Sequence, residues 1–328
     1  MSAMKEPGIV VNPGGPSAPG RVFEAAFRGV VRPVLRTFPI NRLTLPVGAA
    51  LIDGLSMLRP EPGGIDREQV RLKGFRMEIV RPAGASQALR HGAVLYFHGG
   101  GFAICGLRTH RPVVAGLARR TGLPVVNVEY RQLPGTRITE SLVDCLEAYR
   151  WLLRHRVDPA RIVIAGDSAG GLLAFSTVLA ALQAGLPAPA GILGLSPLLD
   201  LDYAAKSEYE KTARDAYIPL AALTAVVRLG GEVAGVLDPK LSPVNAPLAG
   251  LPPVLLIAAE QELLRFDSEL MARRLTAAGV PNSLELWRGT VHDFMSIAPN
   301  LPEGRAALAR ASRFIRARIE QDEHVRTA

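Results

Sequence analysis

Short apolar runs alternate with amphipathic segments along most of the chain after residue 69. This pattern predicts β-strands at 70–72, 75–80, 93–97, 124–130, 161–165, 191–195, 254–259 and 283–287, and helices at 112–121, 139–155, 172–185, 267–278 and 303–319. Apolar strands that alternate with helices predict an α/β fold, with a mostly parallel central sheet and helices on both faces. In such sheets the functional loops lie at the carboxyl ends of the strands.

The turn after the strand 161–165 reads Gly-Asp-Ser-Ala-Gly-Gly at residues 166–171. A G-x-S-x-G pattern between a strand and a helix is typical of a nucleophile elbow, a strained turn that exposes the serine hydroxyl. Small residues are needed there because the backbone passes close to its neighbours. Ser168 is therefore the candidate nucleophile, although a plain glycine-rich turn is the alternative in a chain with 32 glycines.

A second glycine-rich turn, His-Gly-Gly-Gly at residues 98–101, follows the apolar strand 93–97. Backbone N–H groups in such a loop are suited to stabilise the oxyanion of an acyl-transfer reaction. Taken alone, the loop is also consistent with a merely flexible connection, but two matching motifs in this order favour an enzyme. The candidate oxyanion donors are the N–H groups of Gly99, Gly100, Gly101 and Ala169.

A serine nucleophile requires a histidine to accept its proton and a carboxylate to orient that histidine. In folds with a nucleophile elbow the histidine follows the serine, which leaves His292 and His324. His324 lies in the polar terminal tail, where little would position it. His292 follows the last predicted strand and is the candidate base.

The orienting carboxylate is expected in the loop after the strand 254–259. Four carboxylates occur there, namely Glu260, Glu262, Asp267 and Glu269. Spacing alone does not choose among them. Asp267 would suit the N-cap of the following helix and Glu269 its first turn, where carboxylates often have structural roles.

With these motifs the chain resembles the hormone-sensitive-lipase-like carboxylesterases, the bacterial family IV of the α/β-hydrolase superfamily. The similarity runs from Val94 to the C-terminal helix and includes Asp-Pro-Ala-Arg-Ile at 158–162, Ser-Pro at 242–243 and Leu-Pro-Pro at 251–253. The resemblance implies an α/β-hydrolase fold with a helical cap. It also implies hydrolysis of short- to medium-chain acyl esters through an acyl-enzyme, without cofactor or metal.

The resemblance also assigns individual residues. The family's acid-bearing segment matches residues 262–265, which implies a Ser-His-Glu triad with Glu262, rather than Asp267, as the acid. His98 and Asp167 are expected to support the site structurally, without proton transfer by His98. Asp293 replaces the family's glycine after the histidine, and we expect its side chain to face solvent.

The chain divides into a leader, a cap and a catalytic domain. Prolines and glycines predict a disordered leader over 1–20, and apolar residues at helical spacing predict a helical cap segment over 21–60. Breaks at Pro33 and Pro46 are expected to divide that segment into short helices. The catalytic domain spans 65–328, with 200–236 as the second cap segment. The basic, amphipathic stretch 21–58 also suits peripheral membrane contact.

Composition limits the partners. The net charge of +8 comes from scattered arginines without a basic block, which argues against a nucleic-acid partner. Cys105 and Cys145 are too few for a disulfide framework, and a cytoplasmic location is expected. The uncharged stretch 168–199 is divided by prolines and is interpreted as buried. A membrane-associated lipase, a non-catalytic ligand-binding protein and a homodimer stay open as alternatives.

Overall fold

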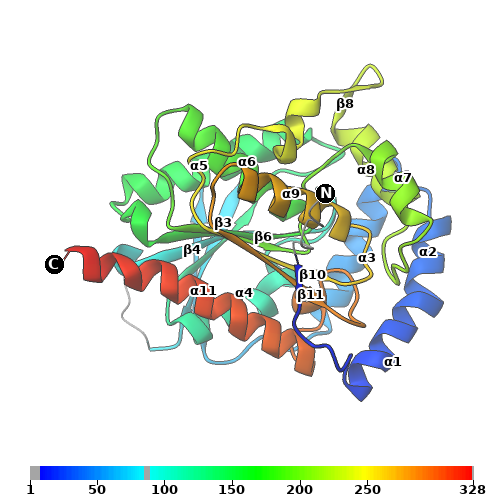
Figure 1. The fold of residues 1–328 in the computed structure, drawn as a ribbon, viewed down its shortest axis with the longest axis horizontal. Helices are drawn as coiled ribbons and strands as arrows, with labels where there is room; N and C mark the ends of the chain where they lie inside the picture. Colours follow the sequence, from blue (N-terminus) through cyan, green and yellow to red (C-terminus); the bar gives the residue numbers. More distant parts are fainter. Residues whose placement is uncertain (1–7, 85–88, 327–328) are drawn as a thin grey trace, which may run out of the picture.

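The computed structural model describes residues 8–84 and 89–326, with side chains as far as residue 320. Within these residues one nine-stranded sheet forms the centre of the molecule (Figure 1). β3 runs antiparallel to both of its neighbours, β2 and β5, and all the other neighbouring pairs in this sheet are parallel. In spatial order the strands are β1 (Gly8–Val10), β11 (Asn282–Trp287), β10 (Val254–Ala259), β7 (Gly191–Leu195), β6 (Ile162–Asp167), β4 (Ala93–Phe97), β5 (Val125–Glu129), β3 (Arg76–Pro82) and β2 (Ile65–Arg71).

Helices cover both faces of this sheet (Figure 1). One face packs against α5 (Ile138–Arg154), α6 (Ala169–Gln183) and α9 (Arg265–Ala277), and the other against α4 (Leu107–Thr121) and α11 (Pro302–Arg326). The central strands are buried on both sides, which explains their continuous apolar sequences. The predicted α/β-hydrolase architecture is confirmed.

The two glycine-rich turns lie side by side because their strands are neighbours. β4 pairs with β6 in parallel, with Phe97 opposite Gly166, so the turns after both strands emerge at the same edge of the sheet. The next strands in space are β7, β10 and β11. Loops from five strands therefore converge at one edge, as expected for a parallel sheet.

The first cap segment contains α1 (Ala18–Ala26), a π-helical turn (Phe27–Val31), α2 (Arg32–Thr37) and α3 (Leu45–Met57). The predicted break at Pro33 is wrong, since the chain stays helical from α1 to the end of α2. Arg32 ends the π-helical turn, and its N–H donates to the carbonyl of Phe27. Pro33 comes next and has no N–H to donate, and the π-helical turn lets the helix continue through this position. Pro46 lies in the first turn of α3, where its missing N–H costs little.

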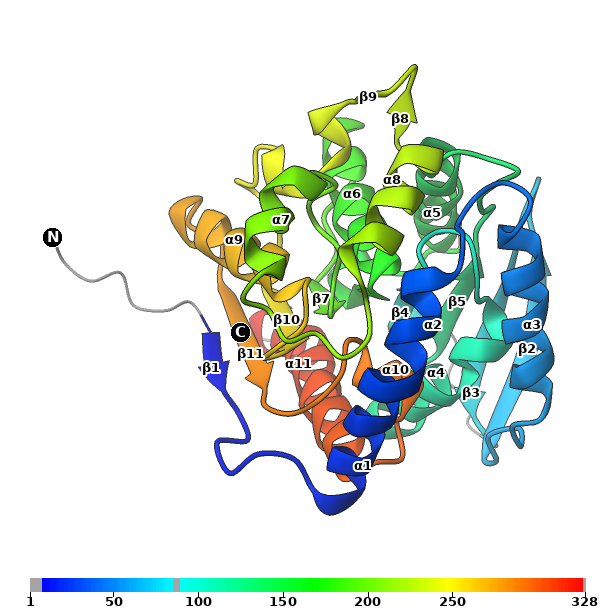
Figure 2. The ribbon, with the colours of Figure 1, turned by 90° about the vertical axis from the view of Figure 1, so that its right-hand side faces the viewer.

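The second cap segment lies between β7 and β10 and contains α7 (Tyr203–Glu210), α8 (Leu220–Gly230) and a hairpin of β8 (Glu232–Val233) and β9 (Val236–Leu237). Figure 2 shows α8 beside α2 at the same side of the sheet. Arg28 and Arg32 donate hydrogen bonds to the carbonyls of Arg214 and Ile218, both at 2.9 Å. These contacts join segments that are about 180 residues apart in the chain.

The expectation of a disordered leader over 1–20 is wrong from Gly8 onward, and residues 1–7 lie outside the described residues. β1 pairs in parallel with β11 and extends the sheet at that edge. Ser17 then caps α1 by accepting the N–H of Gly20, and its own N–H donates to Glu303 of α11. Composition did not indicate this because the stabilising partners lie far away in the sequence.

Among the described residues, none of the helices combines the length and hydrophobicity that a bilayer span requires. The uncharged stretch after Ser168 forms the buried helix α6 and the buried strand β7, as predicted. Cys105 and Cys145 are both free thiols.

Close packing at the nucleophile turn yields a test of the fold. A Cβ on Gly170 would lie 2.0 Å from the carbonyl oxygen of Phe97, in backbone that cannot yield easily. Gly170→Ala should lower the free energy of unfolding by about 2 kcal/mol or more. Gly54→Ala, in the exposed α3 helix with nothing near its Cβ, should raise it by up to about 1 kcal/mol. Equal effects of the two changes in urea unfolding would contradict this packing.

Candidate active site

Three residues from three strand ends meet at the edge of the sheet. The Oγ atom of Ser168, after β6, lies 3.0 Å from Nε2 of His292, and Nδ1 of His292 lies 3.1 Å from Oε2 of Glu262. His292 follows β11 and Glu262 follows β10. The side chains of Glu260 and Glu269 instead form ion pairs with arginines. The structure thus brings together the serine, histidine and glutamate that the sequence analysis singled out.

Ser168 has a strained backbone, with φ of 50° and ψ of −120°. Its N–H donates to the carbonyl of Leu195, and the helix α6 begins at the next residue. A side chain at Gly166 would place a Cβ 2.2 Å from the carbonyl oxygen of Gly170. Only a sharp turn flanked by glycines allows this geometry, which matches the strand–turn–helix context of a nucleophile elbow.

Asp267, the other carboxylate considered for His292, has partners of its own. It accepts backbone N–H groups from residues 199 and 200 at 2.8 and 2.9 Å, and its Oδ1 lies 3.0 Å from Nζ of Lys206. Both side chains of this ion pair are fully buried. The suggested N-cap role is wrong, because Leu264 is the N-cap of α9 and Asp267 lies in the first turn. Asp267 therefore connects α9 to the start of the second cap segment.

Burial and charge act in opposite directions on the pKa of His292. Burial alone would lower it, but the charge and hydrogen bond of Glu262 outweigh burial and raise the pKa above its usual value. For Glu262 burial is the largest effect, and it raises the pKa of the carboxyl despite the nearby imidazole. The loop that carries Glu262 is held by Asp215, which accepts the N–H of Leu263 at 2.7 Å.

Two of the three loop glycines face the space beside Ser168. Gly100 and Gly101 line the cavity there, together with Ala169, and no acceptor within the described part of the chain takes the N–H of either glycine. The N–H of Ala169 opens helix α6 and has no partner within the helix. The prediction that Gly99 is a further oxyanion donor is wrong, because its N–H donates to Oδ2 of Asp167 at 2.9 Å.

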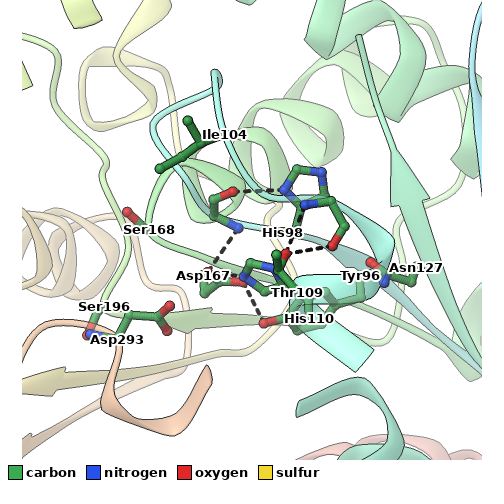
Figure 3. A network of polar contacts seen from close by, with 12 residues as sticks. Tyr96, His98, Ile104, Thr109, His110, Asn127, Asp167, Ser168, Ser196 and Asp293 are labelled. Carbon is green, nitrogen blue, oxygen red and sulfur yellow. Dashed lines mark hydrogen bonds and ion pairs between the residues drawn. The ribbon is translucent and has the colours of Figure 1, made fainter. Parts of the chain in front are cut away.

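The carboxylate of Asp167 is the centre of a buried network (Figure 3). Its Oδ1 accepts the hydroxyl of Tyr96 at 2.6 Å, and its Oδ2 lies 3.1 Å from Nε2 of His110, besides the bond from Gly99. Burial opposes ionisation, but His110 and Tyr96 outweigh it and lower the pKa of Asp167 to about 2. Asp167 therefore stays charged and fixes the start of the glycine loop.

His98 supports the same loop from the other side. Its ring stacks on Tyr130 with centroids 4.4 Å apart, and Nδ1 hydrogen-bonds the carbonyl of Gly99 at 2.8 Å. The hydroxyl of Tyr130 donates to the carbonyl of His98 at 2.8 Å. Burial lowers the pKa of His98 to about 4, so the ring is neutral at physiological pH.

Asp293 does not face solvent, and that prediction is wrong. Its side chain is only 6% exposed because the residue adopts a left-handed conformation, with φ of 56°, that turns it inward. Figure 3 shows it near Asp167 and Ser196. Burial, followed by the charge of Asp167, raises the pKa of Asp293 well above its usual value, which favours the neutral form of the carboxyl.

Asp293 thereby completes a trio with His110 and Asp167, whose potential ligand atoms all lie within 4.8 Å of one another. Three such groups are chemically suited to hold a metal ion. Here Asp167 already hydrogen-bonds Tyr96, Gly99 and His110, and we assign no metal to the trio. Neither Tyr96 nor His110 stands in a motif that would have revealed this role from the sequence.

A cavity of about 440 Å³ opens beside Ser168. Its walls are mostly aliphatic and come from both cap segments as well as from the glycine loop. Cys105 also lines it, and burial raises the pKa of that thiol to about 12, so it is not a competing nucleophile. The cap contributes Phe27, Val31, Leu35, Ile40, Leu45, Ile52, Leu55, Tyr217, Ile218, Ala222, Leu223 and Val226.

Comparison with known proteins gives consistent matches. Residues 94–296 match the family model described as the alpha/beta hydrolase fold. The chain is 34% identical to the carboxylesterase/phospholipase LipF of Mycobacterium tuberculosis over 94% of this chain and 84% of that protein. It is 36% identical to the esterase LipU of the same organism over 76% of this chain and 86% of that protein.

Among solved structures, an esterase of the bacterial hormone-sensitive lipase family superposes with a TM-score of 0.81 at 31% identity, covering 92% of this chain and 99% of the other. Fold, site geometry and similarity agree on the class. The chain belongs to the α/β-hydrolases, and within them to the hormone-sensitive-lipase-like bacterial family.

The raised pKa of Asp293 predicts a measurable effect on stability. Because the pKa of Asp293 is higher in the folded state than in the unfolded state, its protonation stabilises the fold. This stabilisation is complete below the pKa of the unfolded state and is lost as the pH rises toward the pKa of the folded state. Asp293→Asn removes the titration and keeps a hydrogen-bond donor for Asp167. The variant should therefore gain thermal stability relative to the wild type as the pH rises from about 5, by an amount that levels off above the folded pKa. A difference in melting temperature that does not change with pH would contradict this assignment.

Proposed function

We propose that the chain, an ester hydrolase by its family, cleaves short- to medium-chain carboxylic esters through an acyl-enzyme formed on Ser168. One observation carries this proposal, the continuous hydrogen-bonded series from Ser168 through His292 to Glu262 at 3.0 and 3.1 Å. These distances lie within the range for a nucleophile, its general base and the group that orients the base. The names of the relatives support the same reaction class.

In the proposed first step, the Oγ of Ser168 attacks the ester carbonyl while Nε2 of His292 takes the hydroxyl proton. Collapse of the tetrahedral intermediate breaks the bond to the alcohol, which leaves with the proton from His292. Water then attacks the acyl-enzyme with His292 again as the base. The second tetrahedral intermediate breaks its bond to Oγ of Ser168, His292 returns the proton to that oxygen, and the acid is released. Glu262 accepts a hydrogen bond from the Nδ1–H of His292 throughout, and in the neutral imidazole this directs the lone pair of Nε2 at Ser168.

The oxyanion of both intermediates would be held by the N–H groups of Gly100, Gly101 and Ala169. These donors line the cavity beside Ser168. Fixed backbone donors of this kind contribute roughly a hundred- to a thousand-fold in rate each. The hydrogen bonds from Gly99 and His98 to their neighbours keep the loop in place before substrate binds.

The cavity supports the choice of substrate. Its aliphatic walls and its volume of about 440 Å³ suit an apolar acyl or alkyl group, and its position beneath both cap segments limits the length of that group. We place the acyl chain against the side chains of the first cap segment. The cytoplasmic location expected from the sequence stays a prediction, and a homodimer stays an open alternative.

Removal of the proposed nucleophile is the direct test. Ser168→Ala should reduce kcat for p-nitrophenyl butyrate by about a thousand-fold or more, because only the oxyanion donors and substrate binding would remain. A fluorophosphonate probe should label the wild type and not this variant. Ser207→Ala, an exposed change on α7, should retain full activity and labelling. A wild type that neither hydrolyses the ester nor reacts with the probe would favour the non-catalytic binding protein.

The proposed acid is tested by the pH dependence of kcat/KM. Since Glu262 raises the pKa of His292, Glu262→Gln should shift the acidic limb of the profile to lower pH and reduce the maximum by roughly a hundred- to ten-thousand-fold. Asp267→Asn breaks the buried pair with Lys206 and should mainly lower the melting temperature. Glu269→Gln is the folded control on the same helix. An unshifted acidic limb in Glu262→Gln would remove Glu262 from the role.

A further inference from the structure

The helices of the first cap segment carry apolar side chains on two sides. One side lines the cavity, with Phe27, Val31 and Leu35 at intervals of four residues. The other side faces solvent. A surface helix of a globular protein is normally apolar on one side only, because the second side gains nothing from exposure to water.

On α3 the solvent-facing side is a continuous stripe. Val47, Leu51, Leu55 and Leu58 follow one another at intervals of four, four and three residues, with exposed fractions of 65, 62, 53 and 81%. This spacing places all four on one side of a helix. The stripe therefore presents large aliphatic side chains to the surroundings along the whole helix.

A second stripe on the π-helical turn and α2 joins the first. Val30, Val34 and Phe38 are 63, 56 and 38% exposed at intervals of four residues. The ring of Phe38 reaches α3, since a Cβ on Gly48 would lie 3.9 Å from it. We call these seven side chains the outer apolar face: Val30, Val34, Phe38, Val47, Leu51, Leu55 and Leu58.

This face concentrates the exposed apolar surface of the molecule. Of the fourteen large apolar side chains that are exposed in the described part of the chain, ten lie between residues 22 and 58. Figure 1 shows α2 at the right-hand edge of the molecule, and Figure 2 shows α3 at the right-hand edge of the second view. No described segment of the chain covers the face, and exposed apolar patches of this kind mark interaction sites.

The charges around the face identify the partner. Residues 21–59 contain six arginines against Glu24 and Asp53, a net charge of +4. Arg36, Arg42 and Arg59 are exposed, and none of them forms an ion pair with a carboxylate of the described residues. A second copy of the chain in a two-fold contact would bring +4 against +4, whereas an anionic lipid surface attracts arginines and accepts aliphatic side chains.

The cavity reaches this face. Leu55 belongs to the outer apolar face and also lines the cavity, and Arg59, one helical turn further along the chain, lines the cavity as well. An apolar molecule in the lipid surface would therefore enter the cavity without crossing water. We propose that the outer apolar face docks on anionic lipid surfaces and that the cavity opens toward the lipid.

Vesicle co-sedimentation of the full chain tests this proposal. With vesicles of phosphatidylcholine that contain one third phosphatidylglycerol, the wild type should sediment, and with phosphatidylcholine alone its partition coefficient should be lower by about tenfold or more. In the double variant Leu51→Gln/Leu58→Gln the partition coefficient on anionic vesicles should fall about tenfold or more. The variant removes two aliphatic side chains that would be buried in the lipid on docking. Neither residue lines the cavity.

The matched control is Val143→Gln/Val236→Gln, at positions that are 58 and 69% exposed and lie outside the first cap segment. It should bind vesicles like the wild type. Arg36→Gln/Arg42→Gln should reduce binding to anionic vesicles about fivefold for each arginine and leave binding to neutral vesicles unchanged. Melting temperatures of all variants show that they are folded.

Equal vesicle binding by the wild type and the Leu51/Leu58 variant would overturn the proposal. So would a wild type that ignores anionic vesicles but forms a dimer in ultracentrifugation that the same variant dissociates, which would assign the face to a second copy. Hydrolysis of soluble p-nitrophenyl butyrate is independent of docking. Its persistence in a variant that has lost vesicle binding separates the two proposals.

Discussion

The buried carboxylate of Asp167 connects the two turns on which the site is built. Asp167 is the last residue of β6, directly before Ser168, and it accepts hydrogen bonds from the N–H of Gly99 and from the hydroxyl of Tyr96. A charge without access to water is costly unless hydrogen bonds compensate for it. The nucleophile turn and the glycine loop therefore have one favourable relative position. Small residues at 99, 166 and 170 are needed because the backbones meet so closely.

Different parts of the molecule hold the proposed catalytic side chains and form the cavity. The sheet holds the three proposed catalytic side chains at the ends of β6, β10 and β11, whereas the cavity is closed by two cap segments from distant parts of the chain. The segments meet at Phe27 and Tyr217, whose rings are 4.9 Å apart, and the ring of Tyr217 lies 5.9 Å from that of His292. The proposed base is thus in contact with the part of the protein that shapes substrate binding.

Local patterns in the sequence were sufficient to predict the parallel sheet and most of its elements. They also singled out Ser168 and His292, and the family resemblance added Glu262; the structure places His292 within hydrogen-bond distance of both other residues. Patterns of this kind work because strand periodicity and turn chemistry are short-range properties. The choice between Glu262 and Asp267 needed the family resemblance, since both carboxylates follow the same strand.

The errors have a common physical origin in contacts between distant segments. Asp293 turns inward because its backbone is left-handed and Asp167 lies nearby. The N–H of Gly99 donates to the carboxylate of Asp167 and is therefore not free for an oxyanion. Pro33 does not break its helix because a π-helical turn precedes it. Sequence patterns do not encode such pairings directly. In the same way, the composition of the first twenty residues gave no indication that β1 pairs with β11.

The short strand β1 has a consequence for how the cap moves. The first cap segment is attached at both of its ends, through β1 in the sheet and Ser17 on Glu303 at one end and through β2 at the other. It is a strap fastened across the cavity rather than a flap with a free end. Widening of the entrance must therefore come from bending inside the strap, where the loop 38–44 separates α2 from α3. Engineering that shortens the N-terminus past Val10 would unfasten the strap and bare the edge of β11 to other chains.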